Sequence, residues 1–306
     1  MTQTMAVRRK KRVDIPGVII NAIFTFSSIF IFILPFYLVI SVSLTSDAEM
    51  LKNGYQFFPE ALDFTAYRYV FSNTNQLVAS YITTAGQSFL GTFLSVVVMS
   101  LCAYSLSRPY FFIKKPLTLY IFFTMIFSGG LIPSYIINTQ YLKLGNSFWV
   151  YILPGLVAPF YLIIIRTFFQ GLPPALAESA KIDGANEFVI FSRIAMPLSK
   201  PVLATVALLL LLDRWNNWYT SMIYIRSTNL YTLQYLLQRI LLESQTLKSM
   251  IDNLPPGMSI SATDINMPVE GLRYAMCVVA AGPMVVIFPF FQKYFSRGLT
   301  VGAVKG

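Results

Sequence analysis

The chain has 306 residues, 56% of them hydrophobic, and a mean hydropathy of +0.62, which is too apolar for a soluble domain and indicates a membrane protein. The net charge of +10 is accounted for by membrane topology and anionic lipid, so nucleic acid is not an expected partner. The absence of histidine excludes imidazole acid–base chemistry and a His-ligated metal site.

Uncharged runs long enough to cross a hydrocarbon core of about 30 Å set the number of spans. Four runs exceed this length, and a fifth, Tyr274 to Gln292, is just long enough. A further run, starting at Pro201, meets Asp213 and Arg214 after only twelve residues, so a span there must continue to Ile225 and carry both charges. We therefore predict an all-α integral membrane protein with six spans, at about 17–43, 79–106, 117–138, 147–168, 199–225 and 273–292.

Charge sets the orientation of these spans. The sequence "RRKKR" at 8–12 places the basic arm 1–15 in the cytoplasm, and six spans return the tail 298–306 to the same side. Fifteen of the 23 Lys and Arg residues then face the cytoplasm, in agreement with the positive-inside rule. The first span is too long for a signal peptide, so we expect it to be retained. A permease domain over 16–297 in a bacterial cytoplasmic membrane, with both termini inside, is the predicted organisation.

The cytoplasmic segment 173–197 is unusually charged, with "ESAKIDGANEF" at 178–188. Its two leading prolines suit a first helical turn, Asp183 and Gly184 break that helix, and Asn186 is a candidate N-cap for a second one. The pattern predicts two short helices joined by a sharp turn. Their small side chains allow another protein to approach closely, and Glu178 offers it a charged contact.

The fifth span carries a second unusual cluster. Charges inside a membrane span indicate function by default, because exposing them to lipid is costly. Aromatic faces and amide donors are also what a sugar ring needs, and Arg214 would suit an acidic sugar. The same aromatic residues would equally form an interfacial belt beside a structural ion pair, and the sequence leaves both interpretations open. The cluster comprises Asp213, Arg214, Trp215, Asn217, Trp218 and Tyr219.

The outer loop 226–272 contains an amphipathic stretch, "LQYLLQRILLESQTLKSMI", followed by an irregular one. A connection of this length usually carries function. The alternative to such a functional surface is a lid that packs on the chain's own spans.

The spacing in 178–197 resembles the cytoplasmic motif of importer-type ABC permeases, which reads E-A-A, three residues, G, nine residues, I, any residue, L-P. Here Glu178-Ser179-Ala180 is followed at that spacing by Gly184, Ile194 and Met196-Pro197, with Ser179 and Met196 as the departures. Other stretches, among them "GGLIPSYI" and "GLTVGAVKG", are similar to the carbohydrate-uptake branch. That branch includes the second permease subunit of the maltose importer and permeases for pectin- or alginate-like oligosaccharides, and the resemblance covers roughly 15–306.

The resemblance implies a type I importer permease fold with a cytoplasmic coupling helix. It implies partners for this chain: a second permease, two copies of an ABC ATPase, and an extracytoplasmic sugar-binding protein that meets the outer loop and delivers an oligosaccharide. The chain would transport and not catalyse, and it would bind no cofactor, since it has no G-x-x-x-x-G-K-[S/T] loop and ATP and Mg would sit on the ATPase. The residues that would contact the ATPase are Glu178, Ser179, Ala180, Asp183, Gly184, Ile194 and Pro197, with Gly302, Lys305 and Gly306 in the tail.

Two other classes compete with this interpretation. A secondary transporter driven by an ion gradient would need no ATPase, and it would need paired carboxylates in its spans, for which only Asp213 qualifies. A membrane enzyme or receptor would need a catalytic or ligand-binding constellation, which the sequence lacks. For the tail, a frayed end without contacts is the alternative.

Overall fold

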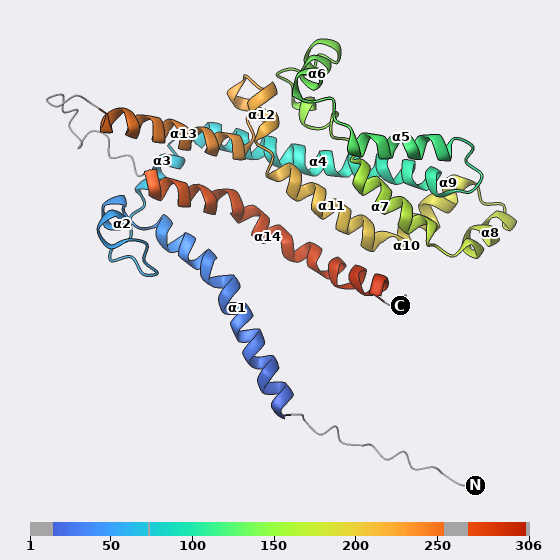
Figure 1. The fold of residues 1–306 in the computed structure, drawn as a ribbon, viewed down its shortest axis with the longest axis horizontal. Coiled ribbons are helices and arrows are strands. Elements are labelled where there is room, and N and C mark those ends of the chain that lie inside the picture. Colours follow the sequence, from blue (N-terminus) through green and yellow to red (C-terminus); the bar gives the residue numbers. More distant parts are fainter. Residues whose placement is uncertain (1–14, 73, 254–268, 304–306) are drawn as a thin grey trace, which may run out of the picture. The chain divides into compact units, whose positions relative to one another are not determined.

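The structure, a computed structural model, describes residues 15–72, 74–253 and 269–303. Every regular element in these ranges is a helix, which confirms the all-α prediction (Figure 1). The chain divides into two compact units, one of Met1–Tyr67 with Pro268–Val278 and one of Arg68–Met267 with Val279–Gly306. We describe each unit by itself.

The first unit begins with helix α1 (Ile15–Ser43), whose apolar side chains are largely exposed, as in a helix meant for lipid or for another protein. Helix α2 (Asp47–Asn53) follows, capped by the hydroxyl of Ser46. The Asp47 carboxylate accepts hydrogen bonds from the backbone N–H groups of Glu270 and Gly271, at 3.1 and 2.9 Å. It thereby caps the start of α14 (Val269–Ala303), where an anion is favoured. Helix α3 (Thr65–Val70) begins in this unit.

The second unit is organised around α4 (Thr74–Ser107), which packs along α7 (Pro159–Gln170) and α11 (Lys200–Trp215). Small side chains recur on the buried face of α4 and let the neighbouring helices come close. These buried small residues are Ser80, Thr84, Ser88, Gly91, Thr92 and Ser95. Helix α5 (Lys114–Ile126) packs against both α7 and α4.

Several expected spans are broken helices. The predicted third span is broken at Gly130, which has φ +89° and lies between α5 and α6 (Leu131–Ile136). Helix α6 continues directly into the π-helix η1 (Ile137–Tyr141). The two parts bend by 114°. The predicted fourth span contains the 3-10 helix η2 (Phe148–Tyr151), and α7 starts only at Pro159, because Pro154 and Gly155 interrupt the stretch between them.

The fifth predicted span also differs from the structure. We expected one helix to Ile225, but α11 ends at Trp215 and α12 (Tyr219–Tyr224) starts a new one. The break has a local cause, because the Asn217 carboxamide caps α12 by accepting a hydrogen bond from the N–H of Thr220 at 3.0 Å. Three described helices are long and apolar enough to cross a membrane, and up to six spans result if each bent pair counts as one.

In the outer loop, the 3-10 helix η4 (Thr228–Leu230) precedes α13 (Leu233–Asp252), a helix where the sequence predicted an amphipathic stretch. Leu233, Leu236 and Leu237 are buried on its inner side, and the N–H of Leu233 donates to the Thr84 hydroxyl at 2.7 Å. The first part of α13 therefore packs on its own span α4, as a lid would.

Candidate functional site

The charged segment 173–197 lies at one end of the second unit and contains α8 (Pro174–Ile182), α9 (Glu187–Ile190), the π-helix η3 (Phe191–Ala195) and α10 (Met196–Leu198) (Figure 1). Helix α13 lies at the opposite end of the same unit. The two-helix prediction is confirmed, with α8 as the first arm; the second arm, from Glu187, includes a π turn and runs on past Pro197 to Leu198.

The turn between the two arms is a Schellman motif. Gly184 takes φ +80°, the N–H of Ala185 donates to the carbonyl of Ala180 at 2.9 Å, and the N–H of Gly184 donates to that of Lys181 at 3.0 Å. Asn186 then caps the second arm, its Oδ1 accepting from the N–H of Val189 at 2.9 Å. Asp183, Gly184 and Asn186 thus have the roles that their residue types predicted.

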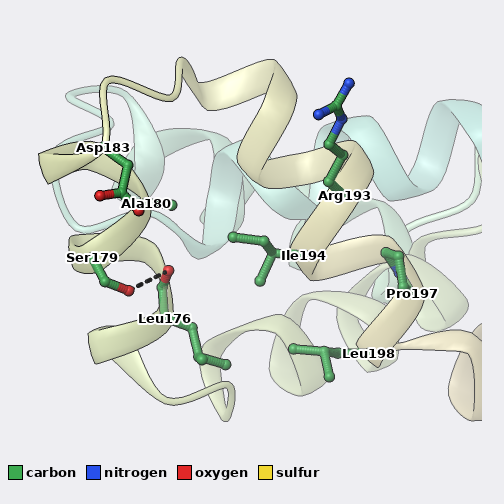
Figure 2. Close-up of a pocket in the computed structure, with 8 residues that line it drawn as sticks. All are labelled: Leu176, Ser179, Ala180, Asp183, Arg193, Ile194, Pro197 and Leu198. Atoms are coloured by element: carbon green, nitrogen blue, oxygen red, sulfur yellow. Dashed lines mark hydrogen bonds between the residues drawn. The ribbon is translucent and has the colours of Figure 1, made fainter.

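A groove of about 400 Å³ separates the two arms (Figure 2). Leu176, Ser179 and Ala180 of α8, with Asp183 at its end, face Ile194 and Leu198 across it, whereas the Arg193 guanidinium extends away. The structure therefore brings together five of the seven residues of this segment that were predicted to contact an ATPase. They are Ser179, Ala180, Asp183, Ile194 and Pro197.

Glu178 lies on the exposed side of α8. Within the described residues, its carboxylate forms no ion pair or hydrogen bond. Two large apolar side chains nearby are also exposed, Ile182 at 87% and Phe188 at 69%. This end of the unit therefore offers another protein a carboxylate without a partner, together with apolar side chains in contact with solvent.

Glu187, which the sequence analysis did not single out, is the most connected polar residue of the segment. Its carboxylate accepts a hydrogen bond from the Tyr104 hydroxyl at 2.7 Å and pairs with Lys181 Nζ at 2.6 Å. Arg108 Nε lies 3.7 Å from the same carboxylate, and the guanidinium of Arg108 lies over the Tyr104 ring, 4.1 Å from its centroid. No spacing in the sequence links positions 104, 108, 181 and 187, so only the fold identifies this cluster.

Burial of Glu187 acts to raise its pKa. The hydrogen bonds from Lys181 and Tyr104, and the charges of Lys181 and Arg108, outweigh that effect and leave the pKa lowered. Glu187 is therefore a carboxylate at neutral pH.

Arg214 is 6% exposed, and both Nη atoms of its guanidinium are hydrogen-bonded. Nη1 donates to the Tyr151 carbonyl at 2.9 Å, and Nη2 donates to the Gly155 carbonyl at 2.8 Å and the Ser95 hydroxyl at 2.9 Å. The Arg214 side chain thus supplies the hydrogen-bond donors for carbonyls of the irregular stretch before α7. No Asp213–Arg214 ion pair forms among the described residues, which corrects the structural pair considered from sequence.

The remaining cluster residues divide by exposure. Trp215 is buried and its indole N–H donates to the Ala280 carbonyl at 3.1 Å, while Asn217 caps α12. Asp213, Trp218 and Tyr219 are exposed, and the two aromatic rings meet edge to face with centroids 6.0 Å apart. In the tail, Gly302 lies in α14, and Lys305 and Gly306 lie outside the described residues.

Comparison with known families matches residues 76–301 to the family of binding-protein-dependent transport system inner membrane components. Among curated proteins, the chain is 35% identical to the polygalacturonan/rhamnogalacturonan transport system permease protein YtcP of Bacillus subtilis (strain 168), over 90% of this chain and 93% of that protein. It is 36% identical to Protein LplC of the same strain, over 90% of each chain.

Among solved structures, the fold is similar to one chain in the crystal structure of a bacterial ABC transporter involved in the import of the acidic polysaccharide alginate. The TM-score is 0.74 at 27% identity, and the match covers 94% of this chain and 99% of that one.

Proposed function

This chain belongs to the family of binding-protein-dependent transport system inner membrane components, and from that membership we propose that it is a permease subunit of an ATP-driven ABC importer for an oligosaccharide. The chain moves substrate across the membrane and leaves covalent chemistry to others. Membership in this family, and relatives that are permeases of sugar transport systems, favour this function over a secondary transporter driven by an ion gradient.

The observation that carries the proposal is the bent segment 173–197. In our proposal this segment docks on an ABC ATPase, and Glu178 pairs with a basic residue of that subunit. The exposed Glu178 carboxylate, the exposed Ile182 and the groove lined by Ser179 and Ala180 support this assignment. ATP and Mg bind to two copies of the ATPase, whose closure moves the segment and, with it, the membrane helices.

A second, homologous permease completes the translocation path, and both termini lie in the cytoplasm. The basic arm 8–12, next to anionic lipid, supports this orientation. In the tail, Gly302, Lys305 and Gly306 reach the ATPase. The outer loop 226–272, with α13 at its centre, meets the extracytoplasmic sugar-binding protein.

The substrate class follows from the relatives. One is a permease of a polygalacturonan/rhamnogalacturonan system and another belongs to an importer of the acidic polysaccharide alginate, so we propose an acidic oligosaccharide for this chain. Trp218 and Tyr219 expose aromatic rings on which sugar rings stack. Arg214, Trp215 and Asn217 support that surface through their hydrogen bonds. Asp213, the residue before Arg214, is also exposed, and we include it in the proposed substrate path.

Uptake into proteoliposomes tests the function. The complete complex, with its second permease, ATPase and binding protein, is supplied with labelled oligogalacturonate outside and ATP with Mg inside. We expect uptake that needs ATP and survives an ionophore that collapses proton and sodium gradients. Uptake without ATP that the ionophore abolishes would contradict the proposal.

A further inference from the structure

Packing alone would hold helix α8 only loosely. Its small residues Ala177 and Ala180 reach the hydrophobic core, but the groove leaves the side facing the second arm open (Figure 2). Apolar contact between small side chains does not fix the angle of a nine-residue helix, because such faces slide past each other at little cost. A directional contact is needed to hold the angle.

The Glu187 carboxylate supplies that contact, because its two oxygens face different helices. One oxygen, Oε1, lies 2.6 Å from Lys181 Nζ on α8. The other, Oε2, accepts the 2.7 Å hydrogen bond of the Tyr104 hydroxyl from the end of α4. Glu187 itself opens α9, so one side chain connects three helices within a few ångströms.

The two sides of this bridge differ in rigidity. The Tyr104 ring packs edge to face against Phe169 of α7 and Phe191 of η3, with centroids 5.9 and 5.1 Å away, and the residue is 6% exposed. The position of its hydroxyl is therefore fixed by the core of the membrane bundle. Lys181 and Glu187 are about half exposed, so the contact on the α8 side is free to adjust.

We propose that Glu187 is a positioning residue, which sets the angle of α8 against the end of α4 and passes the displacement of α8 through Tyr104 to the membrane helices. This inference rests on the proposed function, in which α8 contacts the ATPase. Arg108 belongs to the same device, since its guanidinium lies both beside the Glu187 carboxylate and over the Tyr104 ring. Tension on α8 thus acts on α4, the helix that packs along both α7 and α11.

The test uses Glu187→Gln and Tyr104→Phe in the complete reconstituted importer. The quantity measured is the coupling ratio, defined as saccharide molecules transported per ATP hydrolysed. Each change removes one part of the bridge, and we expect the ratio to fall about two- to fivefold. Both variants should retain the ATPase on purification as well as the wild type does. Equal retention would show that a lower ratio does not come from loss of folding or of docking.

Two further measurements make the test specific. The double variant Tyr104→Phe/Glu187→Gln should lower the ratio no further than the stronger single change, because both act on one contact. The matched controls are Tyr141→Phe, an exposed tyrosine of η1, and Glu60→Gln, an exposed glutamate far from the segment in sequence. Both controls should keep the wild-type ratio.

A wild-type ratio in both single variants would overturn the inference, and so would loss of the ATPase from them at an unchanged ratio. Where Glu187→Gln does not assemble, Tyr104→Phe decides alone, since it deletes one oxygen and leaves the ring in place. A wild-type complex with no ATP-dependent uptake would instead refute the proposed function.

Discussion

The hydroxyl of Tyr104 donates a 2.7 Å hydrogen bond to the carboxylate of Glu187 across 83 positions of sequence. Tyr104 lies in the last turn of the long helix α4, and Glu187 opens the second arm of the cytoplasmic segment. Lys181 on α8 reaches the same carboxylate from the first arm. The bend that would meet an ATPase is therefore tied to the membrane bundle by a polar contact as well as by packing.

The lowered pKa of Glu187 predicts how its contribution to stability depends on pH. A carboxylate whose pKa is lower in the folded protein stabilises it above the ordinary glutamate value of about 4.3. That contribution is lost as the pH falls through the lowered pKa, when the charge facing Lys181, Arg108 and the Tyr104 hydroxyl disappears. We expect the difference in melting temperature between wild type and Glu187→Gln to stay constant from about pH 7 to 5 and to shrink below about pH 4. A difference that disappears between about pH 7 and 6 would refute this.

Gly184→Ala should weaken the bend between the two arms. Nothing lies within 4 Å of an added Cβ, so the cost is that of φ +80° for an alanine, about 1–2 kcal/mol. Thermal melting in detergent should detect the loss, and Gly184→Asn should recover part of it, since asparagine tolerates this conformation. Gly282→Ala also places its Cβ in open space, but within helix α14 at an ordinary φ, and should melt at least as high as the wild type, since alanine is favoured over glycine inside a helix. Equal melting of Gly184→Ala and Gly282→Ala would exclude backbone strain at this turn.

Glu178→Lys reverses the exposed charge of α8 without disturbing any contact among the described residues. We expect normal membrane insertion and loss of ATPase retention, because truncating one partner of a charge pair at an interface costs about 2–5 kcal/mol. Glu60→Lys makes the same charge change on another exposed glutamate and should retain the ATPase. Full retention and full transport by Glu178→Lys would remove this residue from the docking contact.

Arg214→Gln should reduce uptake of acidic and neutral saccharides to the same extent. It leaves the Tyr151 and Gly155 carbonyls without their donors, and each buried unpaired group costs about 1–3 kcal/mol. A stronger loss for acidic saccharides alone would instead indicate direct contact with substrate.

Gly91→Ala should have the same effect as Arg214→Gln, because its Cβ would lie 2.6 Å from Nη1 of Arg214 and force the guanidinium out of place. Gly86→Ala on the same helix, where the added Cβ makes an ordinary 3.4 Å contact with the Phe148 ring, is the control. We expect Gly91→Ala to melt at a lower temperature than Gly86→Ala. Identical melting curves for these two variants would contradict the assigned role of Arg214.

Local chemistry made the cytoplasmic bend predictable from sequence. Gly184 at a left-handed position, Asn186 as a cap and Pro174 in a first turn each follow from the residue's own conformational preferences. Hydrophobic runs likewise predicted an all-helical membrane chain, because length and apolarity act over one segment at a time.

The long-range contacts were not predictable in this way. Arg214 was interpreted as an intramembrane charge facing Asp213 or a sugar, yet it satisfies carbonyls 59 and 63 positions away. The unwound backbone of the fourth predicted span depends on such a partner, since it is stable in a membrane only where another element supplies its hydrogen bonds. Glu187 was passed over for the same reason, because its partner Tyr104 lies on a different helix.

The central claim is that the segment 173–197 couples this permease to an ATPase. The most direct measurement is purification of the intact complex in mild detergent, with a cysteine placed at Ile182 in a variant lacking Cys102 and Cys277 for short-range cross-linking. We predict that an ABC ATPase and a second permease co-purify, and that position 182 cross-links to the ATPase. Recovery of a lone homo-oligomer, with no cross-link from position 182 to any nucleotide-binding subunit, would contradict the account.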